Sequence, residues 1–368
     1  MKKVNSFIIL MFLLIAGALF LYACGEEEEG EDIWSYSVGS PIYASPCISG
    51  NKIIVASLDG KILCFNSGDG SISWQYEIDG EIEASPLIEG DNVYIASMNG
   101  KLYCLELETG DKRWEYDASS PIVSSPAFYE NKIFFATTEG NLYAVSTNGD
   151  LIWTKELNGS LVATPSIEDG KLVIGSLSGY VYCIDVSNGE KKWDFEANAP
   201  IEVGASIDED GYIYIGTSTG KVYCLNLDNG DELWDFLAGS EINSPLSISD
   251  NMVFVPSSGG TLYVLSSSDG RLLWTYKSSG TSLSSPSVTD GYIYFGDSEG
   301  NIYCLEIDSG TEEWIAEKDS PISSSPSLKG DKLFIGTTGG KFYCIEANSS
   351  NCNWPTFRGN QARTGREP

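Results

Sequence analysis

Short apolar runs alternate with turn-forming residues along nearly the whole chain. In residues 81–117, EIEASPLIEGDNVYIASMNGKLYCLELETGDKRWEYD, four apolar runs are separated by EGDN, MNGK and ETGD. Runs of this length bounded by Gly, Asn and Asp predict β-strands joined by tight hairpins. We therefore expect four antiparallel strands here, near residues 83–88, 93–97, 102–106 and 113–116.

The same pattern repeats with a fixed period, which the tryptophans mark. They stand at Trp34, Trp74, Trp114, Trp153, Trp193, Trp234, Trp274, Trp314 and Trp354, so successive spacings are 39 to 41 residues. A constant period of this size is typical of a repeat architecture built from one supersecondary unit. Nine tryptophans bracket eight repeats, and each repeat is expected to supply four strands.

Two features of the repeat indicate how the units pack. The third strand, LYCL in residues 102–105, is apolar on both faces, so both faces must be covered by neighbouring sheets. A proline recurs in the first strand, where it disfavours a central position and predicts an edge strand; these prolines are Pro46, Pro86, Pro126, Pro165, Pro245, Pro286 and Pro326. The expected fold is an all-β, eight-bladed β-propeller of four-stranded antiparallel blades.

The segments CLELETGDKRW, CIDVSNGEKKW, CLNLDNGDELW and CLEIDSGTEEW, which end at Trp114, Trp193, Trp234 and Trp314, carry a family resemblance. They resemble the tryptophan-docking motif of the pyrroloquinoline-quinone-type (PQQ-like) β-propeller repeat family, and the resemblance extends from Trp34 to Trp354. It implies the propeller fold. The architecture also resembles the lipid-anchored eight-bladed propellers of the outer-membrane protein assembly machinery.

Closing the ring requires a choice, because Trp34 and Trp354 both keep the register of a fourth strand. Pro355 weakens residues 353–357 as a strand. We therefore expect residues 33–37 to form the outer strand of the last blade.

The N-terminus has the pattern of a bacterial lipoprotein signal. Lys2 and Lys3 precede an apolar run over 7–22, which ends in LYAC at Cys24. The resemblance implies a signal peptide over 1–23 and lipidation of Cys24; an uncleaved membrane anchor is the alternative. We expect an acidic, lipid-anchored tether over 24–31, a propeller over 32–357 and a C-terminal tail over 358–368. This places the protein outside the cytoplasm, at an outer membrane or a cell surface.

Composition excludes several functions. The chain has 22 basic and 52 acidic residues, a net charge of −30, which disfavours nucleic acid as a partner. It has no histidine, so a Ser-His-Asp triad and a zinc-histidine site cannot form. We expect no catalytic residue, no metal and no cofactor. The cysteines that align at one third-strand position are expected to fill the core: Cys64, Cys104, Cys183, Cys224, Cys304 and Cys344.

Positions that differ between blades are the candidate binding residues. At the mouth of the channel the aligned residues are Tyr43, Glu83, Val123, Val162, Glu202, Asn243, Leu283 and Ser323. Tyr43, Glu83, Glu202 and Asn243 could hold an extended peptide or a small ligand, or the mouth could be a water-filled vestibule. Lys61, Lys101 and Lys341 form a basic arc that could guide an acidic partner. Alternatively, these lysines only keep their hairpins soluble.

The sequence as a whole favours a monomeric, non-catalytic scaffold that binds envelope or surface proteins, with outer-membrane protein assembly as its most concrete form. One alternative is a cell-surface propeller that binds carbohydrate or another ligand. A PQQ-dependent dehydrogenase is the other alternative. The family resemblance implies a vicinal disulfide and long insertions for such enzymes, and the sequence has no adjacent cysteine pair and no insertion.

Overall fold

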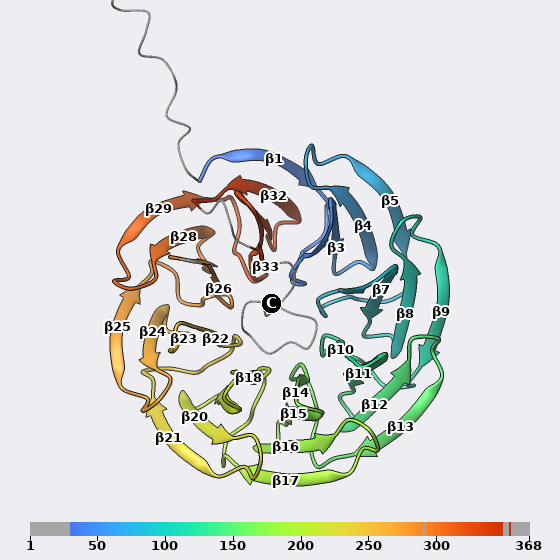
Figure 1. Cartoon of the computed structure of the whole chain (residues 1–368). Helices are drawn as coiled ribbons and strands as arrows, with labels where there is room; N and C mark the ends of the chain where they lie inside the picture. Colours follow the sequence, from blue (N-terminus) through green and yellow to red (C-terminus); the bar gives the residue numbers. More distant parts are fainter. Residues whose placement is uncertain (1–29, 290, 349–352, 355–368) are drawn as a thin grey trace, which may run out of the picture.

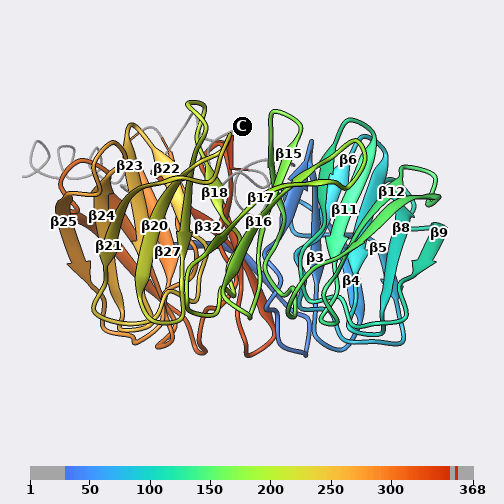
Figure 2. The same cartoon turned by 90° about the horizontal axis from the view of Figure 1, so that it is seen from below.

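The computed structural model describes residues 30–289, 291–348 and 353–354, and these form a ring of eight antiparallel β-sheets (Figure 1). Seven sheets have four strands and the eighth has five. Seen edge-on, the sheets stand side by side as the blades of a disc (Figure 2). The expected eight-bladed propeller is confirmed.

Each blade runs from a short innermost strand to a long outer strand. The first strands are β2 (Cys47–Ser49), β6 (Leu87–Glu89), β10 (Ala127–Tyr129), β14 (Ser166–Glu168), β18 (Ser206–Ile207), β22 (Ser247–Ser249), β26 (Ser287–Val288) and β30 (Ser327–Lys329). The second strands are β3 (Lys52–Ala56), β7 (Asn92–Ala96), β11 (Lys132–Ala136), β15 (Lys171–Gly175), β19 (Tyr212–Gly216), β23 (Met252–Pro256), β27 (Tyr292–Gly296) and β31 (Lys332–Gly336).

The third and fourth strands complete the blades. The third strands are β4 (Lys61–Asn66), β8 (Lys101–Glu106), β12 (Asn141–Ser146), β16 (Tyr180–Asp185), β20 (Lys221–Asn226), β24 (Thr261–Ser266), β28 (Asn301–Glu306) and β32 (Lys341–Glu346). The fourth strands are β5 (Ile72–Glu77), β9 (Lys112–Asp117), β13 (Leu151–Glu156), β17 (Lys191–Glu196), β21 (Glu232–Leu237), β25 (Leu272–Lys277), β29 (Glu312–Glu317) and β1 (Asp32–Ser37).

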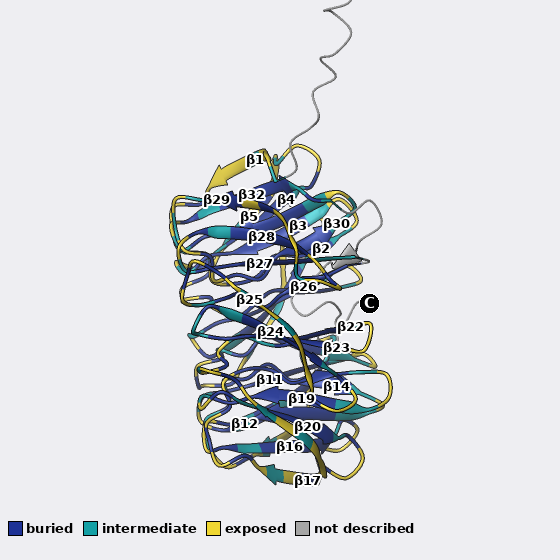
Figure 3. Ribbon diagram, turned by 90° about the vertical axis from the view of Figure 1, so that its left-hand side faces the viewer, coloured by how far each residue is buried: buried dark blue, intermediate teal, exposed yellow. Residues whose placement is uncertain are grey.

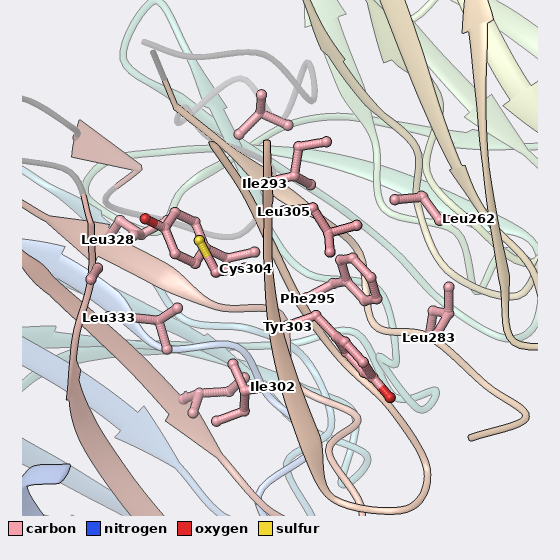
Figure 4. Packing of buried hydrophobic residues seen from close by; sticks show 14 of the residues in the cluster. Leu262, Leu283, Ile293, Phe295, Ile302, Tyr303, Cys304, Leu305, Leu328 and Leu333 are labelled. Carbon is pink, nitrogen blue, oxygen red and sulfur yellow. The ribbon is translucent and has the colours of Figure 1, made fainter. Parts of the chain in front are cut away.

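The core lies between neighbouring blades, because second and third strands are covered on both faces. Burial decreases toward the outer strands, as β1 and β17 show in Figure 3. In β28, Cys304 and Tyr303 lie on opposite sides of the strand, and both are buried among side chains of adjacent blades (Figure 4). Burial raises the pKa of the equivalent Cys104 thiol to about 12. The aligned cysteines therefore fill the core, as expected.

The repeated tryptophan joins each blade to the next. Trp74 of β5 donates its Nε1 hydrogen to the carbonyl of Leu107 at 2.9 Å, and its ring lies against Gly110 in the turn of the next blade. Gly110 has a φ of +77°, in the left-handed region that favours glycine. This contact explains why a turn glycine and a tryptophan recur together in the sequence.

The ring closes through the N-terminal strand. β1 pairs antiparallel with β32, with Trp34 opposite Cys344, so the expectation for residues 33–37 is confirmed. Gly30 N donates to Glu346 O at 3.2 Å, just as Gly70 N donates to Asn66 O at 2.9 Å inside blade one. The N-terminal residues thus complete, without a covalent connection, the same turn that the other blades form within one hairpin.

The other candidate strand takes a different place. β33 (Asn353–Trp354) pairs with β30 at the inner side of the eighth blade, so β30 is not an edge strand. The prolines also differ from expectation, because they precede the first strands instead of lying inside them. β6, for example, begins directly after Pro86. Because proline has no backbone N–H to donate to a neighbouring strand, the strand starts at the next residue.

Several predictions for the chain ends concern residues that the structure does not describe. The signal peptide over 1–23, lipidation of Cys24 and the tail over 358–368 lie outside the described residues. Within the described ranges, no helix has the length and apolar character needed to cross a membrane.

Candidate functional site

The loops that enter the first strands line one opening of the ring. Leu58 N donates to Pro41 O at 2.8 Å, so the entry loop of blade one and its hairpin between second and third strands share one face. We call the opening on this face the channel mouth. Its cavity has a volume of about 190 Å³ and brings together the four predicted binding residues, Tyr43, Glu83, Glu202 and Asn243. All four side chains are exposed to solvent.

An arc of hydroxyl groups lies beneath these residues, and Gly204 interrupts it in blade five. Ser45 N donates to Ser85 Oγ at 3.0 Å, Ser85 N donates to Ser125 Oγ at 2.9 Å, and Ser325 N donates to Ser45 Oγ at 2.8 Å. These serines are buried and line the cavity. The hydroxyls of Ser45, Ser85 and Ser125 each accept a hydrogen bond from a neighbouring blade, so their own hydrogens can point to a ligand. The sequence signal was the serine that recurs before the strand prolines, and it was missed.

The mouth carries negative charge. Glu83 and Glu202 are its acidic residues, and no basic side chain is among the described residues that line it. Carboxylates, an amide and hydroxyls together suit a cationic group or a peptide. They do not fit PQQ, because the quinone cofactor is a polycarboxylate and two glutamates would repel it.

Blade seven breaks the symmetry of the mouth. Ser282 occupies the position where blade one has the buried Ile42. Leu283 turns inward instead, is 2% exposed, and forms a β-bridge with Asp297. The expectation that Leu283 belongs to the mouth ring is therefore wrong, because a leucine is needed to replace the missing isoleucine in the core. A side cavity of about 220 Å³, lined by Asn243 and Ser282 among others, opens next to the mouth.

Asp297 is the buried acidic group beneath this irregular loop. Its carboxylate accepts hydrogen bonds from Tyr303 Oη at 2.8 Å, Gly280 N at 2.9 Å and Asn301 N at 2.9 Å. Burial opposes its ionisation, but the hydrogen bonds from Asn301 and Tyr303 outweigh burial and hold the pKa of Asp297 below its usual value. Asp297 thus fixes the backbone around Gly280, so its role is to hold the blade-seven loop.

The three lysines of the predicted basic arc lie at the starts of third strands in blades eight, one and two. Each faces a carboxylate: Lys61 pairs with Asp59, Lys101 with Glu115 at 2.6 Å, and Lys341 with Asp319 at 2.7 Å. The arc is therefore a series of exposed ion pairs, and its positive charge is locally compensated. Attraction of an acidic partner to this surface would have to compete with these pairs.

Comparison with known proteins gives one matching family model and several solved structures of similar fold. The family model described as outer membrane protein assembly factor BamB matches residues 14–193, 123–241 and 177–365. A search of curated protein sequences finds no match.

Several solved structures are similar to the chain in fold. The structure of BamB from Moraxella catarrhalis is 19% identical, with a TM-score of 0.74, and the match covers 86% of this chain and 99% of that one. The computationally designed protein Ika8 is 18% identical, with a TM-score of 0.79, over 86% of this chain and 100% of the other. The quinohemoprotein alcohol dehydrogenase from Comamonas testosteroni is 11% identical, with a TM-score of 0.76, over 88% and 77%. At these identities the likenesses show the fold alone.

Proposed function

Because the chain belongs to the family described as outer membrane protein assembly factor BamB, we propose that it is a non-catalytic scaffold that binds protein partners in the cell envelope. The observation that supports this role best is the channel mouth. Its varied side chains, Tyr43, Glu83, Glu202 and Asn243, stand above buried serine hydroxyls that accept hydrogen bonds from neighbouring blades.

The chemistry of the mouth favours an extended, basic peptide segment of a partner. Serine hydroxyls and the Asn243 amide can bond the peptide groups, and Glu83 and Glu202 attract lysine or arginine side chains. The blades hold these groups in place before binding, so little conformational entropy is lost when a partner docks. Lys61, Lys101 and Lys341 form a second candidate surface. Carboxylates of an acidic partner would there replace the protein's own carboxylates as the ion-pair partners of these lysines.

The proposed location is the outer membrane or the cell surface, with the protein held by lipidated Cys24. Palmitate labelling of cells should modify the wild-type protein and leave Cys24→Ala unlabelled. Membrane fractionation should then recover the wild type with lipid and the variant in the extracytoplasmic soluble fraction. Equal palmitate labelling of both proteins would contradict an anchor at Cys24.

Site-specific photo-crosslinking in cells tests the binding role. A benzoylphenylalanine placed at Tyr43, which is 39% exposed at the mouth, should capture envelope proteins, including outer-membrane protein assembly components. Tyr36 is the matched control, because it is the same residue type, is 38% exposed, and lies on the outer strand β1. The control position should capture none of these partners.

Glutamate variants complete the test. Glu83→Gln together with Glu202→Gln should reduce crosslinking from Tyr43, because the substitutions remove the negative charge and keep the shape of both side chains. Glu108→Gln changes the same residue type outside the cavity lining and should leave crosslinking unchanged. Equal capture at Tyr43 and Tyr36 would refute the mouth as the binding site. Capture of no assembly component would refute the outer-membrane assembly role.

A further inference from the structure

Neighbouring blades meet at their outer side, where the fourth strand of one blade packs against the third strand of the next; we call this contact the outer seam. Most outer seams are filled by aromatic residues. Six of the eight blades carry an aromatic residue two positions after the tryptophan of the outer strand. In four of these blades the ring packs edge-on against a tyrosine in the third strand of the next blade, with ring centroids 5.1 to 5.9 Å apart in the pairs Tyr116–Tyr143, Phe195–Tyr223, Phe236–Tyr263 and Tyr276–Tyr303. In blade seven the residue is Ala316, and Lys318 covers Tyr343 instead, with its Nζ 5.0 Å from the ring centroid.

The outer seam between blades three and four departs from this pattern twice. Blade three has Lys155 at the aromatic position, so Tyr182 lacks the usual edge-on ring from its neighbour. Blade four begins its third strand, β16, with Tyr180, where the other blades have Lys, Asn or Thr. Tyr180 and Tyr182 lie side by side as a stacked pair, with centroids 5.9 Å apart and planes inclined by 20°. One change opens the seam, and the other adds an aromatic surface to it.

The result is a groove of about 390 Å³, lined by residues of β13 and the loop after it and by residues of β16 and β17. β13 and β17 are the outer strands of neighbouring blades (Figure 1). The Tyr180–Tyr182 pair forms one wall. Hydrogen-bond donors and acceptors surround this aromatic pair; they belong to Lys155, Glu156, Asn158, Lys191 and Asp194. Lys191 and Asp194 form an ion pair at 2.6 Å, so the charged residues of the groove balance one another.

We propose that this groove binds a neutral sugar ring of an oligosaccharide. The flat apolar face of a tyrosine ring complements the C–H face of a pyranose, and the burial of both faces favours stacking. Sugar hydroxyls need donors and acceptors together, which the ammonium groups of Lys155 and Lys191 and the oxygens of Glu156, Asn158 and Asp194 supply. The balanced charge gives no advantage to a cationic or an anionic ligand. This site lies apart from the channel mouth and is independent of the proposed protein partners.

The test uses two variants that restore the residues of the regular seams. Lys155→Tyr places an aromatic ring over Tyr182, as Tyr116 does over Tyr143, and fills the groove. Tyr180→Lys restores the residue found in blade five, where the Lys221 Nζ lies 4.4 Å from the Tyr223 ring centroid. Thr261→Lys is the matched control, because it puts lysine at the equivalent position of blade six, whose seam is already filled. All three variants should keep the wild-type circular dichroism spectrum and melting temperature.

Binding of maltohexaose, cellohexaose and chitohexaose to the full chain would be measured by isothermal titration calorimetry and saturation-transfer NMR. We expect at least one of them to bind the wild type and Thr261→Lys equally. Its Kd should rise roughly tenfold or more in Lys155→Tyr and in Tyr180→Lys, as the loss of an aromatic contact predicts. The proposal is overturned if none of the three saccharides binds, or if binding is unchanged in both seam variants. Binding of hexa-arginine without any saccharide would also overturn it.

Discussion

Replacing Gly110 by alanine should destabilise the propeller much more than replacing Gly90, although both glycines lie in hairpins of the second blade. Both have positive φ, +77° at Gly110 and +55° at Gly90, so alanine is strained at either position. Their surroundings differ. A Cβ added at Gly110 would lie 2.6 Å from the ring carbon Cδ2 of Trp74, whereas a Cβ added at Gly90 would meet nothing within 4 Å.

The expected magnitudes follow from these contacts. The left-handed backbone costs alanine about 1 kcal/mol, and this is the whole cost at Gly90. At Gly110 the displaced indole adds about 1 to 3 kcal/mol of overpacking. Loss of the hydrogen bond from Trp74 Nε1 to Leu107 O adds about 1 kcal/mol. The free energy of unfolding should therefore fall by about 3 to 5 kcal/mol in Gly110→Ala and by about 1 kcal/mol in Gly90→Ala.

Urea unfolding followed by tryptophan fluorescence and by circular dichroism measures both values. A double-mutant cycle with Trp74→Leu isolates the docking contact, because the added Cβ then has no ring to displace. In the Trp74→Leu background, Gly110→Ala should cost only about 1 kcal/mol. The reasoning would be refuted by equal losses at Gly110 and Gly90, or by a cost at Gly110 that is the same with and without the tryptophan ring.

Three further predictions concern buried and charged groups. Because the pKa of Asp297 is lower in the folded protein than in an unfolded chain, its carboxylate stabilises the fold above the usual aspartate pKa, and this contribution is lost as the pH falls through the folded pKa. Asp297→Asn should lower stability by about 2 kcal/mol at pH 7 and flatten the loss on acidification, and an unchanged pH profile would contradict this role. Burial raises the pKa of Cys104 and Cys183 to about 12, so a disulfide reagent such as DTNB should modify these thiols only after unfolding. Rapid labelling of the native protein would contradict their protection by burial. With PQQ and calcium added, dye-linked oxidation of alcohols or sugars should be absent because Glu83 and Glu202 repel the cofactor, and measurable turnover would disprove this.

Much of the frame could be predicted because it depends on repeated residues. The tryptophan period determines the number of blades, since each tryptophan must meet the turn of the next blade. Ring closure could also be predicted, because a proline after Trp354 lacks the backbone hydrogen that a fourth strand needs. The start of the first strands could not be predicted to the residue, because a proline inside a strand and a proline just before it give the same sequence pattern.

The candidate sites depend on contacts that the repeat does not contain. The sequence shows lysines at the starts of third strands, but the carboxylates that neutralise Lys101 and Lys341 belong to other segments and meet them only in the folded blade. Leu283 was misplaced because alignment assumes that every entry loop follows the same path. The groove at Tyr180 was also missed, although its signal was in the sequence as two departures from the repeat at one seam.

The closure of the ring has a mechanical consequence. β1 is the first strand of the described chain; it pairs with β32 and packs Trp34 on Phe334 and Phe342 of its own blade, and the same ring lies against Gly70 of blade one. A pull on the N-terminal segment therefore acts first on the one outer strand that no hairpin connects to its own blade. Under force, the propeller should open at this strand before any other, and the remaining blades would stay folded while blade eight exposes the edge of β32.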